Sequence, residues 1–174
     1  PYNNYDIIAG QASCAAEIIE DVPNADYIIS PVGGGGLLSG SCLSAHYFGE
    51  GIQVLGAEPK GADDAYRSLR DKIIYPSVNP NTIADGLLTS LGDKTYPIIA
   101  EFCAGILTVN EESIIKCMRL IWERMKIIIE PSSAVTLAVV SENQRRFQNK
   151  NVALILSGGN VDLDRLPWLK NVSV

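Results

Sequence analysis

The sequence predicts an α/β domain with an open parallel sheet and helices on both faces. Four short, β-rich apolar segments alternate with helical patterns along the 174 residues. These segments are apolar on both faces, as is typical of parallel strands covered by helices on each side. The hydrophobic fraction of 47% supports a full core in a chain of this length, and it excludes intrinsic disorder.

The expected elements follow from hydrophobic periodicity. The expected strands cover 27–32, 52–57, 105–109 and 152–156. The expected helices cover 10–19, 36–48, 63–70, 111–126 and 131–147. Between them, 71–92 is marked as irregular by its prolines, asparagines and final glycine, and such long segments more often carry function than packing. No internal repeat or low-complexity tract divides the chain, so 1–174 is interpreted as one domain.

The helix over 111–126 has the clearest pattern. Its apolar residues recur at the spacing of one helical face: Ile114, Ile115, Met118, Ile121, Trp122 and Met125. Asn110 is the expected N-cap, and two acidic residues follow it in the first turn, where the helix dipole favours negative charge. The next helix is expected to begin at Pro131, because proline is tolerated at the first helical position.

Charge and composition exclude several classes of protein. Fourteen Lys and Arg against twenty Asp and Glu give a net charge of −6, the wrong sign for binding nucleic acid. No apolar stretch reaches the roughly eighteen residues of a membrane-spanning helix, so no membrane role is expected. The four cysteines form no C-x-x-C pair, and His46 is the single histidine, which favours a reducing, cytoplasmic compartment. The chain begins with neither Met nor a signal-peptide pattern, and it is expected to be part of a longer protein.

The most specific local feature is four consecutive glycines, Gly33, Gly34, Gly35 and Gly36, between an expected strand and helix. Backbone without Cβ atoms can approach a phosphate closely, and the helix N-terminus adds a favourable dipole. The simpler alternative is a turn that needs positive φ. A Walker loop is excluded because no Gly-Lys-Ser/Thr follows. A dinucleotide site remains an alternative, with Gly34, Gly36 and Glu58, although Ser39 occupies its third glycine position.

A second small-residue loop, 156–162, follows the last expected strand. The pattern suggests strand, small residues and helix, and the carboxyl ends of parallel strands are where ligands bind. Both glycine loops are therefore expected at the same sheet edge. The alternative is an ordinary αL turn in which Ser157 caps a helix.

Taken together, these segments resemble the serine racemase and serine/threonine dehydratase group of fold-type II pyridoxal-phosphate enzymes. The resemblance is carried, in order, by Ala9–Gln11, Pro31–Gly36, Ala57–Pro59, Thr82–Gly86, Glu123–Lys126, Glu130–Pro131 and Ser157–Asp162. It implies that Gly33, Gly34, Gly35 and Gly36 bind the phosphate of pyridoxal 5'-phosphate and that the Ser157 hydroxyl bonds the pyridine nitrogen. A neutral hydroxyl leaves the ring uncharged, which suits β-elimination and racemisation better than transamination.

The resemblance also implies two further sites. Glu58, Ala62 and Asp64 match positions that bind a divalent cation through two carboxylates and a backbone carbonyl, and oxygen ligands suit magnesium, calcium or manganese. Spacing alone favours a simpler interpretation, in which Asp63 and Asp64 open a helix. Lys126 and Asn160 match positions that contact an ATP effector at the interface of a homodimer, although a lysine that ends a helix also complements the dipole.

The sequence departs from the family at three places. Ala12-Ser13 replaces the usual Gly-Thr, and Ser132-Ser133 stands where Thr-Ala or Thr-Gly is commoner. None of the seven lysines lies in the Ser-x-Lys-x-Arg motif of the Schiff-base lysine. The resemblance therefore implies the C-terminal half of such an enzyme, most of its large domain, with no catalytic residue in this chain and the Schiff-base lysine in a missing N-terminal half.

The expected function of the complete protein is that of a serine racemase with serine/threonine dehydratase, or ammonia-lyase, activity on small amino-acid substrates. The chain alone is expected to be inactive. Two alternatives remain open from the sequence: a nicotinamide-dinucleotide domain of the Rossmann type, and a catalytically dead scaffold.

Overall fold

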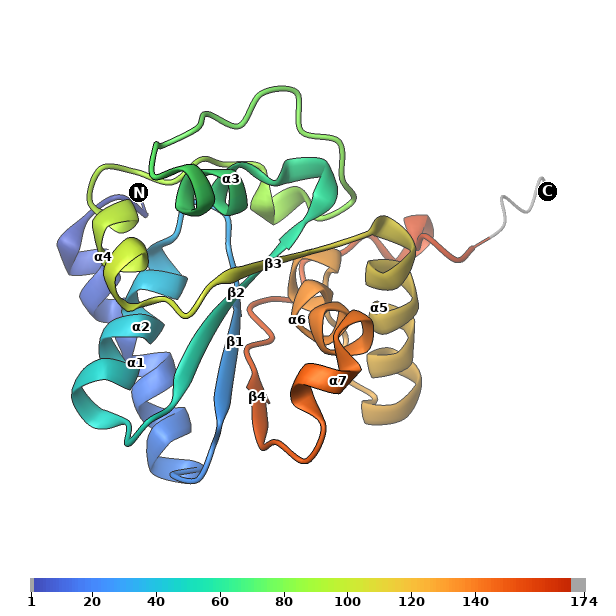
Figure 1. Cartoon of the computed structure of the whole chain (residues 1–174). Coiled ribbons are helices and arrows are strands. Elements are labelled where there is room, and N and C mark those ends of the chain that lie inside the picture. The colour runs from blue at the N-terminus through green and yellow to red at the C-terminus, as the bar shows by residue number, and fades with distance from the viewer. Residues whose placement is uncertain (1, 170–174) are drawn as a thin grey trace.

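In the computed structural model, which describes residues 2–169, the four strands form one parallel sheet in the order β3-β2-β1-β4 (Figure 1). The strands are β1 (Tyr27–Pro31), β2 (Gln53–Pro59), β3 (Ile106–Val109) and β4 (Val152–Leu154). In register, Ile28 lies between Val54 of β2 and Ala153 of β4. The predicted parallel sheet is confirmed, and its carboxyl ends lead into the two glycine loops.

Helices cover both faces of this sheet, as predicted (Figure 1). Two separate apolar clusters result, and Ile28 packs into one while its neighbour Ile29 packs into the other. The first cluster lies under α1 (Tyr5–Asp21), α2 (Gly36–Phe48) and α4 (Thr95–Phe102). The second lies under α5 (Glu111–Met125), α6 (Pro131–Glu142) and α7 (Gln144–Phe147). A short helix, α3 (Asp64–Asp71), follows β2 directly after a 3-10 turn, Lys60–Ala62.

The caps of two helices agree with the sequence. Asn110 caps α5 by accepting a hydrogen bond from the Ser113 N–H at 2.9 Å. Pro131 is the first residue of α6. The helix stops at Glu142 rather than continuing to Phe147, because Asn143 leaves helical geometry and its N–H is shared between Val139 and Val140. The separate turn α7 then covers 144–147.

On the face of the sheet covered by α1, α2 and α4, one predicted helix has the wrong start and one helix was not predicted. Helix α1 begins at Tyr5, five residues before the prediction, because the Asn4 side chain accepts a hydrogen bond from the Asp6 N–H at 2.7 Å and caps the helix there. Helix α4 was not predicted. Its Pro97 suggests a break, but it lies in the first turn, where a backbone N–H has no intrahelical partner.

The segment 71–92 is irregular, as expected, apart from a 3-10 turn at Asp85–Leu87. This turn brings Gly86 and Leu87 to the edge where β1 ends. Within residues 2–169, no helix has the length and apolarity needed to cross a membrane.

Candidate functional site

The tetraglycine loop joins the end of β1 to the N-terminus of α2. Gly35 has φ +86°, a left-handed conformation, whereas the structure gives the other three glycines no positive φ. A Cβ atom on Gly35 would lie 2.7 Å from Leu91 Cδ2 and 2.8 Å from Ile99 Cδ1. The alternative of a turn needing positive φ thus accounts for Gly35 alone. Close approach by neighbours accounts for Gly34, where a Cβ would be 2.2 Å from the Tyr2 ring.

Thr95, which the sequence did not single out, holds this loop by hydrogen bonds from the first residue of α4. Its buried hydroxyl donates to the Gly34 carbonyl at 2.9 Å and accepts from the Gly92 N–H at 2.9 Å. Its own carbonyl accepts from the Ser39 hydroxyl of α2 at 3.2 Å. The Gly34 carbonyl is therefore held by α4. Once that helix is missed, no local signal in the sequence reveals this role.

The loop forms one wall of a pocket of ≈ 350 Å³. Its lining brings Gly33, Gly34, Gly35 and Gly36 together with Ser157 and also includes Gly86, Leu87 and Thr89. No lysine of the described residues lines it. A larger pocket of ≈ 580 Å³ between α1 and α2 contains none of the predicted residues. The smaller pocket, at the carboxyl edge of the sheet, is therefore the candidate site.

The loop after β4 differs from its prediction. No helix follows Ser157 directly; the described chain runs irregularly to a 3-10 turn at Leu163–Arg165, whose cap is Asp162. The alternative of an αL turn is also wrong, since neither Gly158 nor Gly159 has positive φ. A Cβ on Gly158 would lie 3.0 Å from Glu130 Oε1, and one on Gly159 would lie 2.6 Å from the Ile128 carbonyl oxygen. Ser157 is exposed at the pocket and caps no helix among residues 2–169.

The N-terminus of α6 holds two walls of the pocket. Ser132 Oγ accepts from the Gly86 N–H at 2.9 Å. Ser133 Oγ accepts from the Gly158 N–H and donates to the Gly158 carbonyl, both at 2.8 Å, and lies 3.4 Å from Ser157 Oγ. Both serines are buried. The sequence flagged Ser132-Ser133 only as a departure in packing, whereas the structure gives both hydroxyls hydrogen bonds to the site.

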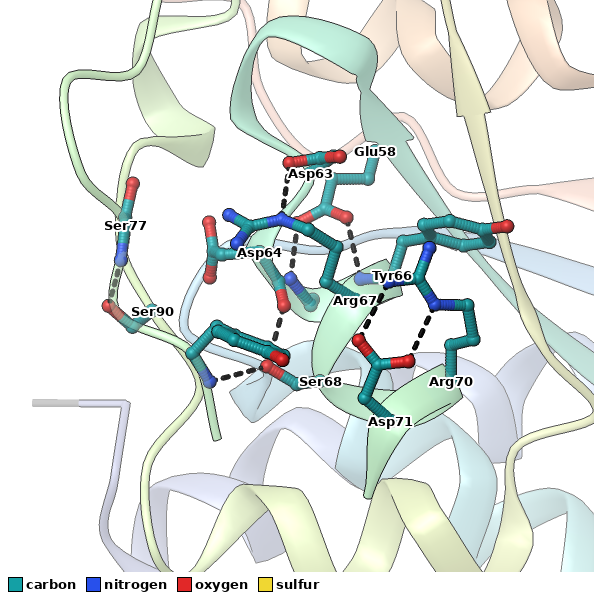
Figure 2. Close-up of polar contacts among 12 residues, drawn as sticks. Glu58, Asp63, Asp64, Tyr66, Arg67, Ser68, Arg70, Asp71, Ser77 and Ser90 are labelled. Carbon is teal, nitrogen blue, oxygen red and sulfur yellow. Dashed lines mark hydrogen bonds and ion pairs between the residues drawn. The ribbon is translucent and has the colours of Figure 1, made fainter. Parts of the chain in front are cut away.

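At the end of β2, Glu58 and Asp64 form a buried acidic cluster, shown in Figure 2. The two Glu58 carboxylate oxygens accept from the Ala65 and Tyr66 N–H groups at 2.9 and 2.8 Å. Both Asp64 carboxylate oxygens are buried, and neither has a hydrogen-bond partner among residues 2–169. In Figure 2 the Asp64 carboxylate points toward the segment with Ser77, whose buried hydroxyl likewise has no partner in the described part of the chain.

Burial dominates the protonation of this acidic cluster. Burial raises the pKa of Glu58 to about 8, and the nearby charge of Asp64 raises it further. The hydrogen bonds from the two N–H groups lower this pKa, but by less. Burial also raises the pKa of Asp64 to about 6, although the charge of Arg67 acts in the opposite direction. Asp63 differs, because its carboxylate accepts from Arg67 Nε at 2.8 Å. The cluster thus holds two carboxylates whose charge the protein leaves poorly compensated.

The orphaned Asp64 oxygens fit a cation bound by oxygen ligands. Ala62, the third predicted ligand, is buried in the 3-10 turn between these two acids. No group of three or more His, Cys, Asp or Glu side chains in residues 2–169 is arranged to hold a metal ion. The predicted set contains only two such side chains, with a backbone carbonyl as the third ligand.

The same geometry argues against the dinucleotide alternative. That interpretation needs an acid free to bond ribose hydroxyls. Glu58 is 1% exposed and lies against the N-terminus of α3, so its carboxylate is out of reach of a ribose.

Lys126 and Asn160 are exposed and are not brought into one pocket. Asn160 lines a pocket of ≈ 360 Å³ with Thr82, Asp85 and Arg165, and its N–H donates to Glu130 Oε2 at 3.0 Å. Lys126 follows α5 at φ 61°, and its Nζ donates to the Glu123 carbonyl at 2.7 Å. This contact is the helix-terminus role that the sequence left as the alternative.

A profile of the family described as "Pyridoxal-phosphate dependent enzyme" matches residues 1–158. The chain belongs to this family of pyridoxal-phosphate dependent enzymes. It is 51% identical over 175 aligned residues to the serine racemase of Dictyostelium discoideum, covering 98% of this chain and 54% of the relative. It is 45% identical to the beta-hydroxyaspartate dehydratase of Paracoccus denitrificans, covering 97% and 53% of the two chains.

Solved structures of the family share the fold. The crystal structure of the Dictyostelium discoideum serine racemase matches with a TM-score of 0.87 and 53% identity, over 92% of this chain and 52% of that one. The maize serine racemase matches with a TM-score of 0.86 and 38% identity, over 90% of this chain and 49% of that one. The chain therefore spans about half the length of the family members it matches.

Proposed function

We propose that this chain is the cofactor-binding part of a pyridoxal-phosphate enzyme that racemises serine and converts serine or threonine to a keto acid and ammonia. The observation that carries the proposal is the pocket in which Gly33–Gly36, after β1, face Ser157, after β4. The relatives named serine racemase and dehydratase support the reaction class. Their names make small β-hydroxy amino acids the substrate class.

The residues of the chain fit the cofactor in two ways. Backbone N–H groups of Gly33–Gly36 at the N-terminus of α2 would hold the phosphate, where the helix dipole favours an anion. The Ser157 hydroxyl would face the pyridine nitrogen as a neutral hydrogen-bonding group. When bound, pyridoxal phosphate supplies the electron sink that stabilises negative charge at the substrate Cα. A hydroxyl partner tempers that sink, which favours elimination and racemisation over transamination.

The covalent anchor of the cofactor is assigned to a lysine outside residues 1–174, in an N-terminal half of the complete protein. Support comes from the absence of any lysine in the lining of the pocket within residues 2–169 and from the half-length coverage of the relatives. The chain then contributes binding and orientation, and the other half contributes the lysine. This division also makes a dead scaffold the less favoured alternative.

Product analysis of the complete protein tests the function. With pyridoxal phosphate and L-serine, we expect both pyruvate and D-serine to form, and borohydride reduction followed by peptide mapping should find the cofactor on a lysine outside this chain. Residues 1–174 alone should form neither product. Labelling of any lysine within residues 1–174, accompanied by activity, would contradict the division between halves.

A divalent cation is the second part of the proposal, with Glu58, Asp64 and the Ala62 carbonyl as its ligands. The buried Asp64 oxygens, without partners among the described residues, support it. Magnesium, calcium or manganese would supply the compensating charge and stabilise the turn between β2 and α3.

A homodimer with an ATP effector near Lys126 and Asn160 is the third part of the proposal. The two residues are exposed, and Asn160 lines a pocket next to Asp85 and Arg165. Isothermal titration of the complete protein with ATP is the test: Asn160→Ala should weaken binding, whereas Asn24→Ala, at an exposed asparagine outside this pocket, should not.

A further inference from the structure

The hydrogen bonds of the Ser133 hydroxyl leave one of its lone pairs free to accept another hydrogen bond. The hydroxyl carries a single proton, and we assign it to the Gly158 carbonyl oxygen, which at 2.8 Å is a nearer acceptor than Ser157 Oγ and also accepts from the Glu130 N–H at 3.1 Å. One of the Ser133 lone pairs accepts the Gly158 N–H, also at 2.8 Å. One lone pair remains, and Ser157 Oγ lies 3.4 Å away. With the Ser133 proton on the shorter bond to Gly158, Ser157 is the donor and Ser133 the acceptor in this longer contact.

From this geometry we infer that Ser133 is a positioning residue that lets the Ser157 hydroxyl accept a hydrogen bond from the cofactor ring. The inference rests on the proposed function and deepens it. Toward a neutral ring nitrogen, Ser157 donates its own proton. Toward a protonated ring nitrogen it must accept, and its proton then needs another acceptor. Ser133 Oγ, fully buried and held by two bonds to Gly158, provides that acceptor.

Ser133 therefore broadens what Ser157 can do. With Ser133 in place, the Ser157 hydroxyl can face the ring in either sense. Without it, only donation to a neutral ring nitrogen remains well satisfied, since the proton would otherwise go to solvent. Ser133 should accordingly raise the proton affinity of the ring nitrogen. Because Ser157 is exposed and water competes for its proton, we expect a modest effect of about half a pH unit, roughly a threefold change in proton affinity.

The adjacent residue provides a matched control. Ser132 is also a buried serine in the first turn of α6, but its hydroxyl accepts from the Gly86 N–H at 2.9 Å, on the other wall of the pocket. Ser132→Ala and Ser133→Ala remove the same atom from neighbouring positions. They should destabilise the chain by similar amounts, whereas only Ser133→Ala should affect the ring.

The test uses 4-deoxypyridoxine 5'-phosphate labelled with ¹⁵N in the ring, which has no aldehyde and needs no lysine. It is bound at saturating concentration to the complete protein after removal of its own pyridoxal phosphate, and the ¹⁵N chemical shift is followed against pH. The midpoint should fall by about half a unit in Ser133→Ala and stay unchanged in Ser132→Ala. In a Ser157→Ala background, Ser133→Ala should cause no further change, because the effect passes through Ser157.

Each outcome decides between the hypotheses. Equal midpoints in the parent and Ser133→Ala, with both variants folded by melting temperature, would overturn the inference and leave the proposed function standing. A shift of equal size in the Ser157→Ala background would assign it to the movement of Gly158 and would also overturn it. If the labelled compound does not bind the complete protein freed of its cofactor, the proposed function fails and the inference fails with it.

Discussion

The pocket and the acidic cluster lie at the same edge of the sheet but are stabilised in opposite ways. The pocket is made from backbone and neutral hydroxyls, and hydrogen bonds from Thr95, Ser132 and Ser133 hold its walls. The acidic cluster buries two carboxylates and leaves both Asp64 oxygens without partners in the described residues. The first region is preorganised by steric fit, whereas the second buries carboxylates with little compensating charge among the described residues.

The largest expected loss of stability comes from breaking the steric fit at Gly35. Gly35→Ala should destabilise the chain by about 2–4 kcal/mol, because the left-handed conformation disfavours Ala and its Cβ would collide with Leu91 and Ile99. Gly51→Ala is the control: Gly51 has φ +78°, but no atom lies within 4 Å of its Cβ position, so the loss should be about 1 kcal/mol. Urea unfolding measures both, and equal losses would contradict the role of crowding.

The next largest change in stability is expected when a divalent cation binds to the acidic cluster, and this change is a gain. Magnesium, calcium or manganese at about a hundred times its Kd should stabilise the parent by about 2.7 kcal/mol relative to chelator. Asp64→Asn should remove this response. The neighbouring Asp63→Asn should retain it, because Asp63 is paired with Arg67. Melting temperature with and without metal is the readout, and a full metal response in Asp64→Asn would exclude this site.

The pH dependence of the metal-free chain sharpens the same contrast. The pKa of Glu58 is about 8 in the folded chain, against an ordinary value of 4.5. The unfolded chain thus loses this proton first, and stability that is full below pH 4.5 should fall as pH rises to 8. Asp64, with a pKa of about 6, acts in the same direction. We expect the free energy of unfolding to fall by about 2 kcal/mol, which is well below the value that the full pKa shifts would give without solvent screening.

Denaturant unfolding in chelator at about pH 5 and about pH 8 measures this loss, and magnesium should reduce it. Stability that instead rises with pH in chelator would mean that the carboxylates are already compensated. The Gly35→Ala and Gly51→Ala variants should show the same pH trend as the parent, since neither substitution changes a titratable group.

The smallest effect is expected for charges that are exposed. Arg119 Nε lies 2.7 Å from Glu123 Oε1 on α5, with both side chains more than half exposed. Solvent screening and side-chain entropy offset such pairs, so Arg119→Ala should leave the melting temperature unchanged within error. A shift as large as that of Asp64→Asn would show that burial is not what distinguishes the acidic cluster.

Much of the fold was predictable because its signals are local. The strands are continuous apolar runs, and the caps at Asn110 and Pro131 follow from the chemistry of single residues. Helix α4 was missed because Pro97 in its first turn suggested a break. The loop after β4 was misassigned because its glycines make room for Glu130 and Ile128 rather than adopt a positive φ.

The site was predictable only in part, for the same reason. Gly33–Gly36 and Ser157 do line one pocket, but the hydroxyls of Thr95, Ser132 and Ser133 act across the sequence, so their roles depend on tertiary contacts. The family to which the chain belongs was identified from its motifs. The cation and nucleotide residues remain predictions.

The pairing of β4 with β1 has a consequence for the order of folding. Tyr27 pairs with Val152, so this contact closes a loop that contains most of the chain. Closing such a loop costs more entropy than forming the nearby β1–β2 pair, and parallel pairings at long sequence separation form slowly. Ser157 reaches the tetraglycine loop only after β4 has joined the sheet. We therefore expect the pocket to be among the last parts to assemble, and a ligand that needs both walls to stabilise the finished fold rather than guide its early steps.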